Sequence, residues 1–384
     1  MTDLGPILSP QPRRLLVRGV NWLGDAVMTT PALQRLRQRF PEAEITILTH
    51  EKIADIYRGQ PVLDETLTFA TGESVWAVAR RLSPGAFDTA LILPNSPRSA
   101  LEPWLARIPR RIGYSRTWRS WLLTHPVAPQ VSGITTRKRS VREIRRLTRL
   151  AAPNPVQQSA FSPEVHHIHH YLRLSATLGG NPEPIAPRLE MPPNEIEGLK
   201  SSCQARIREQ FKFDATAPLA WIGLNPSAAY GPAKRWPAEN LAEVVRLVSA
   251  KLGPAVWLAF GPASDATLCD QIALRSGAPV LNLAGETSVR EFMGLLKLCR
   301  VLLTNDSGPM HLAAALGTPV VALFGSTSPE LTSPGLAGDP RHHILRHPTP
   351  CSPCFRRTCP IDFRCMTSIT VDQVAAALLG VSPV

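Results

Sequence analysis

The residues best suited to chemistry in this chain lie at positions 304–312, which read T-N-D-S-G-P-M-H-L. An apolar run at residues 301–303 predicts a buried strand before them, and the small residues that follow predict a helix ending near Gly317. Such a turn presents backbone N–H groups at the positive end of a helix dipole, where phosphates bind. The candidate anion-binding residues are Asp306, Ser307, Gly308 and His311. The pattern also occurs as an ordinary helix cap, so for this segment alone both interpretations stay open.

A second candidate is Lys234, in the segment N-P-S-A-A-Y-G-P-A-K-R-W-P at residues 225–237. An apolar run at residues 219–224 predicts a strand before it, and Pro237 predicts the start of a helix after it. A lysine between a strand end and a helix N-terminus is well placed to pair with a phosphate, although a loop lysine is often only solvated. Ser227 and Tyr230 belong to the same loop and would line the same site.

The third candidate is Asp25, in the segment R-G-V-N-W-L-G-D-A-V-M-T-T-P at residues 18–31. This segment follows the first predicted strand, at residues 15–17. An aspartate at a helix entrance either caps the helix or, in a cleft, acts as a general base that removes a hydroxyl proton.

Strand-like and helical segments alternate along the chain, which predicts an α/β fold with parallel sheets covered by helices. A proline-rich stretch near residues 185–193 separates two such series. We therefore expect two doubly wound, Rossmann-like domains facing a cleft, with each motif at the carboxyl end of a strand. The expected division is a disordered lead-in at 1–13, an N-terminal domain at 14–186, a linker region at 187–214, a C-terminal domain at 215–350, and a Cys-rich tail with a terminal helix at 351–384.

The chain is strongly basic, with a formal net charge of +12 from 42 Lys and Arg against 30 Asp and Glu. Four arginines share one face of a predicted helix at i, i+3, i+4 and i+7: Arg142, Arg145, Arg146 and Arg149. This face is either simply solvated or a surface for an acidic acceptor or an anionic membrane. No apolar run reaches about 18 residues and the N-terminal segment lacks a secretory pattern, so we expect a cytoplasmic protein without a spanning helix.

Cysteines and histidines raise the question of metal binding. The odd total of seven cysteines argues against a disulfide framework. Four lie in the tail as Cys351-x2-Cys354-x4-Cys359-x5-Cys365, which could form a zinc site or a packed thiol cluster; we expect the cluster, without metal. The histidines at positions 166, 167, 169 and 170 fall on a predicted amphipathic helix, and we expect them on its solvated or acceptor-facing side.

Taken together, the segments at residues 18–33, 225–237 and 304–317 resemble those of the ADP-heptose:lipopolysaccharide heptosyltransferases, glycosyltransferase family 9. The Y-G-P-A-K-R-W-P segment and the Cys-rich tail look most like the heptosyltransferase II branch of that family. The resemblance covers nearly the whole chain. It implies the GT-B fold, in which the N-terminal domain binds the acceptor and the C-terminal domain binds the nucleotide sugar.

The resemblance also implies a role for each motif. Asp25 matches the proposed base, and Lys234 matches the lysine that contacts the diphosphate. The backbone N–H groups of Ser307 and Gly308 would hold the diphosphate, with Asp306 and His311 near the sugar and phosphates. The reaction implied is an inverting transfer of heptose from ADP-L-glycero-D-manno-heptose to the heptosyl inner core of lipopolysaccharide, with no cofactor or metal, at the inner face of the cytoplasmic membrane.

Three other functions would share part of this pattern. Another family 9 heptosyltransferase, I or later, is the nearest alternative. A GT-B sugar-nucleotide epimerase would share the fold. A nucleic-acid-binding protein would account for the charge, but the chain lacks interleaved aromatic and basic residues and any known reader motif, so we expect no nucleic-acid partner.

Overall fold

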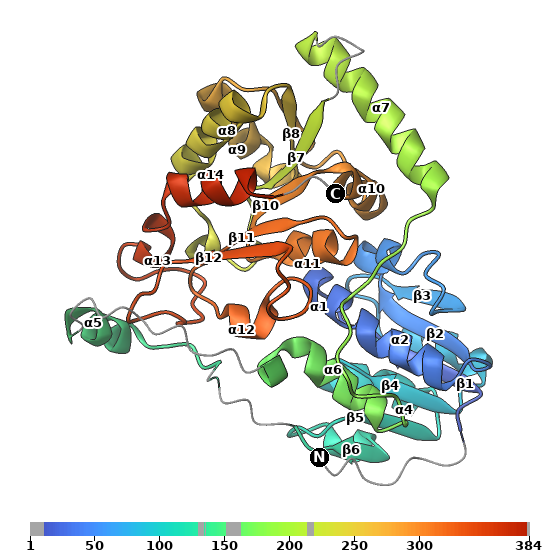
Figure 1. Ribbon diagram of the computed structural model, residues 1–384. Helices are drawn as coiled ribbons and strands as arrows, with labels where there is room; N and C mark the ends of the chain where they lie inside the picture. The colour runs from blue at the N-terminus through green and yellow to red at the C-terminus, as the bar shows by residue number, and fades with distance from the viewer. Residues whose placement is uncertain (1–10, 130–133, 135, 151–162, 213–218, 382–384) are drawn as a thin grey trace. The chain divides into compact units, whose positions relative to one another are not determined.

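The computed structural model describes residues 11–129, 134, 136–150, 163–212 and 219–381. They form two units, each built on one six-stranded parallel sheet (Figure 1). The N-terminal unit comprises Met1–Gly133 and Glu164–Glu190, and the C-terminal unit comprises Ile134–Pro163 and Met191–Val384. The predicted α/β class with two doubly wound sheets is confirmed.

The N-terminal sheet has the strand order β3-β2-β1-β4-β5-β6. Its strands are β1 (Arg14–Arg18), β2 (Glu44–His50), β3 (Glu65–Phe69), β4 (Thr89–Ile92), β5 (Arg110–Tyr114) and β6 (His125–Val127). Its α-helices are α1 (Leu23–Met28), α2 (Thr30–Arg39), α3 (Val75–Leu82), α4 (Pro97–Leu105) and α6 (His167–Ala176). The strand order reverses direction between β1 and β4, and ligands of doubly wound sheets bind at the carboxyl ends of the strands at such a point.

The C-terminal sheet repeats this topology in the order β12-β11-β10-β7-β8-β9. Its strands are β7 (Ala220–Asn225), β8 (Ala255–Ala259), β9 (Val280–Asn282), β10 (Val301–Asn305), β11 (Val320–Phe324) and β12 (His342–Arg346). Its longer helices are α5 (Val141–Leu150), α7 (Pro193–Phe211), α8 (Ala238–Leu252), α9 (Ala266–Ser276), α10 (Val289–Leu298), α11 (Gly308–Ala315) and α14 (Val371–Leu379), and α12 (Pro329–Thr332) and α13 (Arg364–Thr367) are single turns. Here the switch point lies between β7 and β10.

The central strands are apolar because both faces of each sheet are covered. Strands β8, β10 and β11 are buried along their whole length. In the C-terminal unit, Trp257 and Met366 are fully buried within one core cluster that also includes residues of α8 and α14. A rigid sheet of this kind holds the strand ends, and the loops that follow them, in fixed positions.

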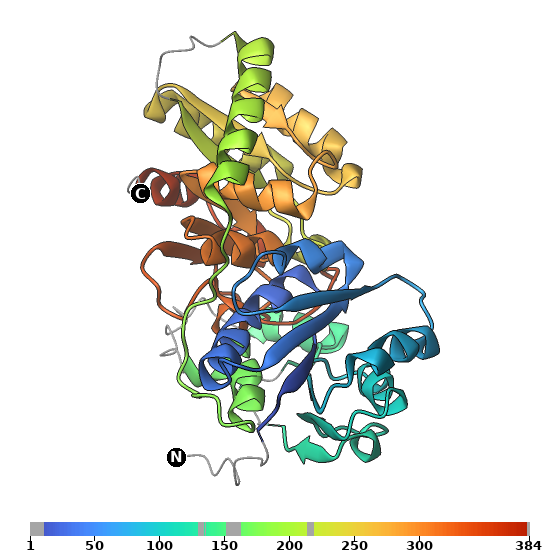
Figure 2. The same cartoon turned by 90° about the vertical axis from the view of Figure 1, so that its right-hand side faces the viewer.

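The segment expected to be a linker contains a long helix. Helix α7 begins directly after Pro192 and runs for 19 residues, with Pro193 in its first turn, where a proline is tolerated. Figure 2 shows α7, in yellow-green, lying along α10, in orange. The ion pair between Arg290 Nε and Glu195 (2.7 Å) joins the two helices, so this segment belongs to the C-terminal unit.

Residues 134–163 also group with the C-terminal unit, whereas the sequence pattern had placed them in the N-terminal domain. The reason is a set of contacts with the tail. Ile144, from α5, is buried against Cys351 and Cys354. The backbone N–H of Arg139 donates to the carbonyl of Cys354 (3.0 Å), and the Arg356 guanidinium donates to the carbonyl of Arg139 (2.9 Å).

The histidines were expected on the solvated or acceptor-facing side of a helix, but two of them pack against the rest of the N-terminal unit. His166 is buried and caps α6, its Nδ1 accepting from the backbone N–H of Ile168 (3.3 Å). The ring of His170 stacks on Tyr114 with centroids 4.0 Å apart. Burial lowers the pKa of His170 to about 4, and repulsion from His167, Arg116 and Arg173 adds to this effect.

This burial predicts a loss of stability in acid. Because the unfolded histidine titrates near pH 6.5, the unfolded state binds the extra proton between about pH 6.5 and 4, and stability falls as the pH drops through that window. One such group contributes up to about 1.4 kcal/mol per pH unit. We expect the His170→Gln variant to lose stability less steeply there, as measured by urea denaturation at a series of pH values. Equal slopes for the two proteins would contradict the assignment.

Candidate active site

Two asparagines connect the loops at the switch point of the C-terminal sheet. Asn225 ends β7, and its amide donates to the hydroxyls of Thr304 (3.1 Å) and Ser307 (3.1 Å). Asn305 ends β10, donates to the carbonyl of Pro226 (2.8 Å) and accepts from the backbone N–H of Trp236 (3.1 Å). The loops after β7 and β10 are therefore tied to each other. Sequence reasoning missed both asparagines, although each is a polar residue that closes a buried strand.

Lys234 and Asp306 meet in this tied region. The ammonium of Lys234 lies 2.6 Å from the carboxylate of Asp306, with side chains only 11% and 5% exposed. The same carboxylate accepts from the hydroxyl of Thr327, in the loop after β11. The ammonium also lies 4.9 Å from the centre of the Tyr230 ring, an arrangement that favours a cation. The structure thus brings two of the predicted residues into direct contact and fixes the position of the Lys234 ammonium at the strand ends.

Helix α11 begins beside this ion pair. Its N-cap is Ser307, whose side chain makes no capping hydrogen bond to the helix and donates instead to the carbonyl of Asn305 (3.2 Å). Gly308 starts the helix, and His311 lies buried one turn into it. The backbone N–H of Gly308, at the positive end of the α11 dipole, and the ammonium of Lys234 together form an arrangement suited to a diphosphate.

Ser227 has a more specific partner than its loop position suggested. Its hydroxyl donates to the carboxylate of Asp265, and both residues are buried. Asp265 ends the short 3-10 turn Ala263–Asp265 after β8. Three loops from neighbouring strands, β7, β8 and β10, are therefore linked at one edge of the sheet. Sequence reasoning did not single out Asp265.

The Cys-rich tail contacts the loop that carries Lys234. The Tyr230 hydroxyl donates to the carbonyl of Phe355 (2.7 Å), and the backbone N–H of Ala233 donates to the carbonyl of Arg357 (2.9 Å). The Arg357 guanidinium also lies 5.5 Å from the centre of the Tyr230 ring, on which Lys234 packs as well. The tail therefore positions the loop that carries Lys234, a role that the cysteine spacing alone did not suggest.

The four tail cysteines carry thiols rather than disulfides. Cys351, Cys354 and Cys365 are buried, and burial raises the pKa of Cys365 to about 12 and raises that of Cys354. Across the described ranges, no three His, Cys, Asp or Glu side chains are arranged to hold a metal ion.

Asp25 lies at the other switch point, in the first turn of α1 after strand β1. Its carboxylate is half-buried and accepts from the Tyr171 hydroxyl (3.5 Å), which comes from α6. Burial raises the pKa of Tyr171 well above its usual value and that of the neighbouring Tyr57 to about 12, with the Asp25 charge adding to both effects. These phenols stay neutral at physiological pH, so Tyr171 can donate to Asp25 without becoming a competing base.

A buried ion pair supports the loop that carries Asp25. Arg18, the last residue of β1, contacts Glu102 of α4 (2.6 Å), and their side chains are 2% and 0% exposed. The same guanidinium donates to the carbonyl of Gly19 (2.5 Å). These contacts fix the backbone directly after β1, and with it the segment that leads into α1. The pattern of residue types at positions 18–31 gave no sign of this distant partner.

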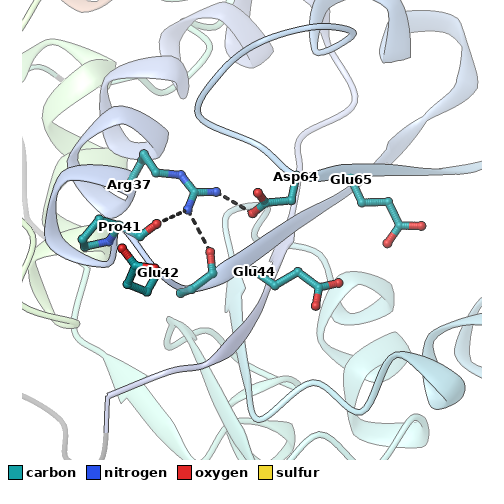
Figure 3. A pocket seen from close by; sticks show the side chains of 7 residues that line it. Arg37, Pro41, Glu42, Glu44, Asp64 and Glu65 are labelled. Carbon is teal, nitrogen blue, oxygen red and sulfur yellow. Dashed lines mark hydrogen bonds and ion pairs between the residues drawn. The ribbon is translucent and has the colours of Figure 1, made fainter.

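An open hollow at the opposite edge of the N-terminal sheet is a poor candidate site. It is lined by Arg37, Pro41, Glu42, Ala43, Glu44, Asp64 and Glu65 (Figure 3). Glu44 and Glu65 start strands β2 and β3, so the hollow lies at amino ends, whereas ligands of these folds bind at carboxyl ends. Arg37 spans it by contacts with Asp64 and the carbonyls of Pro41 and Ala43.

The predicted basic face is present on α5. Four of its arginines are exposed: Arg142, Arg145, Arg146 and Arg149. Ile144, between them in the sequence, is buried. The carboxylate of Glu143 forms an ion pair with the guanidinium of Arg137 (2.9 Å). These arginines belong to the C-terminal unit, whereas Asp25 belongs to the N-terminal unit.

Known proteins resemble this chain over most of its length. Residues 75–363 match the family model described as glycosyltransferase family 9 (heptosyltransferase). The lipooligosaccharide heptosyltransferase 2 of Haemophilus ducreyi is 31% identical over 84% of this chain and 86% of its own length. The lipopolysaccharide heptosyltransferase 2 of Escherichia coli is 32% identical over 84% and 85%. The structure of the E. coli ADP-heptose lipopolysaccharide heptosyltransferase II matches with a TM-score of 0.70 at 27% identity, covering 95% of this chain and 98% of that one.

The contact between the tail and the Lys234 loop can be tested at Gly231. Its φ of +146° is accessible essentially only to glycine, and a Cβ there would lie 2.6 Å from the carbonyl oxygen of Arg357. We expect Gly231→Ala to cost about 1–3 kcal/mol of stability, measured by urea denaturation. Gly198→Ala, on the surface of α7 with open space around it, is the matched control and should be neutral or slightly stabilising. An unchanged Gly231→Ala protein would mean that the tail does not confine this loop.

Proposed function

This chain belongs to glycosyltransferase family 9, the heptosyltransferases, and is therefore a glycosyltransferase; from this premise we propose that it transfers heptose from ADP-L-glycero-D-manno-heptose to the heptosyl inner core of lipopolysaccharide. The observation that carries the proposal is the Lys234–Asp306 pair beside the N-terminus of α11. It supplies a fixed cation and helix N–H groups at the switch point of a chain whose relatives are named heptosyltransferase 2.

The C-terminal unit would bind the donor through its diphosphate. The ammonium of Lys234 and the backbone N–H groups of Ser307 and Gly308 would face the phosphate oxygens, on which negative charge grows as the bond to the sugar breaks. Asp306 orients the lysine and, with His311, would lie near the sugar and phosphates. Because this charge is already present and rigidly held, the proposal assigns no metal or cofactor to the reaction.

Asp25 would act as the general base. The acceptor hydroxyl attacks the anomeric carbon from the side opposite the diphosphate, and its proton passes to the Asp25 carboxylate. The new bond joins the acceptor oxygen to the anomeric carbon, and ADP leaves with the electron pair of the broken bond. This single displacement inverts the anomeric configuration. Arg18 and Tyr171 would act through Asp25, as positioning residues.

The direct test is turnover with ADP-heptose and three purified core acceptors that carry no, one or two heptose residues. Release of ADP and a product larger by one heptose, only with the one-heptose acceptor, is the expected result. Preference for the acceptor without heptose would indicate a heptosyltransferase I activity, and preference for two would indicate a later one. Conversion of the donor without any acceptor would point to an epimerase.

The role of Asp25 predicts a selective loss of turnover. Asp25→Asn should lower kcat by about 10²–10⁴-fold, the usual contribution of a general base, and leave ADP affinity unchanged by calorimetry. Glu42→Gln, which changes an exposed carboxylate on the same unit as Asp25, is the control and should behave as wild type. Near-normal turnover in Asp25→Asn would remove Asp25 from the mechanism.

Lys234→Ala should instead weaken both ADP binding and turnover, because the cation contacts ground and transition states.

Such an enzyme must meet a glycolipid, and the α5 arginines would face its anionic surface. Within the described residues, every helix is too short or too polar to cross a membrane. The proposal therefore places the protein peripherally on the inner face of the cytoplasmic membrane. Each arginine near an anionic surface contributes about 1 kcal/mol of attraction, which salt screens.

Reversing the four α5 arginines to Glu should weaken sedimentation with anionic vesicles at low salt and spare ADP binding. A matched variant reverses four exposed basic residues elsewhere on the same unit, Arg206, Arg208, Lys212 and Lys251. It has the same net charge but should sediment more strongly than the α5 variant. Equal sedimentation of the two variants would show that total charge, not the α5 face, attracts the vesicles.

A further inference from the structure

Three tryptophans are exposed near one another in the sequence of the N-terminal unit. Trp104 at the end of α4, and Trp118 and Trp121 in the loop after β5, are 40%, 81% and 67% exposed. The rings of Trp104 and Trp121 meet edge to face, with centroids 5.8 Å apart. Indoles are normally highly buried, so this tryptophan patch, Trp104, Trp118 and Trp121, calls for a partner.

The loop that carries the patch is ordered by its own bonds. The Ser120 hydroxyl accepts from the backbone N–H of Arg116 (3.1 Å) and donates to the carbonyl of the same residue (3.0 Å). The Arg119 side chain points inward, fully buried, and donates to the carbonyl of Pro94 (2.5 Å). Trp118, directly before Arg119, adopts a φ of +67°, a costly conformation for a bulky residue. The fold thus holds the Trp118 indole in solvent on an anchored loop.

The segment that carries the patch has charge of one sign. Residues 103–129 contain five arginines and no aspartate or glutamate. Arg110 forms an ion pair with Asp88, and Arg111 donates hydrogen bonds to backbone carbonyls. The Arg119 side chain is buried. Arg107 and Arg116 are exposed and make no ion pair with any residue that the structure describes. Exposed indoles with free guanidinium groups and no carboxylate are complementary to an anionic lipid surface.

The composition of this segment favours lipid over a sugar ligand. Recognition of a sugar commonly uses carboxylate or amide side chains for its hydroxyls, and within residues 103–128 the described chain has none.

We infer that the tryptophan patch inserts into the headgroup region of an anionic phospholipid bilayer, with Arg107 and Arg116 on the lipid phosphates. Indoles prefer this region because their rings are apolar and their N–H groups can hydrogen-bond to its polar groups. The inference extends the peripheral location in the proposed function, but it rests on a different surface and on apolar contact, which salt does not screen. The full-length protein should therefore keep part of its vesicle binding at high salt.

The test compares the full-length protein with its W118S/W121S variant in sedimentation with phosphatidylglycerol-containing vesicles. Removing two indoles from the lipid interface should weaken partitioning by about tenfold or more. Brominated lipids should quench the tryptophan fluorescence of the wild type, and most of this quenching should be absent in the variant. The matched control is Trp76→Ser, which removes an equally exposed indole (66%) from α3, three residues after Glu73. This control should bind vesicles as the wild type does.

Turnover separates this inference from the proposed function. On a water-soluble core oligosaccharide without acyl chains, W118S/W121S should turn over as the wild type does. Loss of that turnover with unchanged vesicle binding would make the patch a sugar site and overturn the inference, and so would wild-type vesicle binding or quenching in the variant. If no protein turns over ADP-heptose, the proposed function fails, whereas the vesicle comparison still decides the role of the patch.

Discussion

The buried contact between Lys234 and Asp306 is the interaction on which the C-terminal site depends. Burying an ammonium and a carboxylate is costly, and the cost is recovered only when geometry and additional hydrogen bonds are good. Thr327 supplies such a bond to Asp306, and Tyr230 offers its ring to the ammonium. Removal of either charged partner would leave the other uncompensated. The surrounding loops are therefore constrained to keep the pair together, and this same constraint holds a cation ready for an anionic ligand.

The two units solve the problem of positioning in the same way. Each has the same strand order, and in each the loop after the first strand carries a candidate residue, Asp25 in one and Lys234 in the other. Each loop is also held by a buried ion pair, formed by Arg18 with Glu102 and by Lys234 with Asp306. The difference is chemical. In the N-terminal unit the pair supports the segment that carries Asp25, whereas in the C-terminal unit the pair contains the candidate residue, Lys234, itself.

Much of this arrangement could be predicted from the sequence, because apolar runs mark buried strands and polar residues directly after them lie at one edge of the sheet. This reasoning selected Asp25, Lys234 and Asp306 as candidates. It could not identify Glu102 or Asp265, since their partners are distant in sequence and only the folded chain brings them together. Local patterns also misled where side chains serve structure: an amphipathic period does not distinguish a solvated histidine from one that caps a helix, and arginines on one face of α5 do not reveal what buries the opposite face.

The path of the chain has a consequence for how the protein can be divided. The polypeptide leaves the N-terminal unit at residue 133, contributes α5 to the C-terminal unit, returns at Glu164 to add α6, and leaves again after Glu190. A single cut therefore cannot separate the units. A fragment ending at residue 133 would lack Tyr171, the donor to Asp25, and one beginning at residue 191 would lack the helix that covers the tail cysteines. The two halves are thus interdependent modules, which evolution or an engineer could exchange only by moving two segments of chain at once.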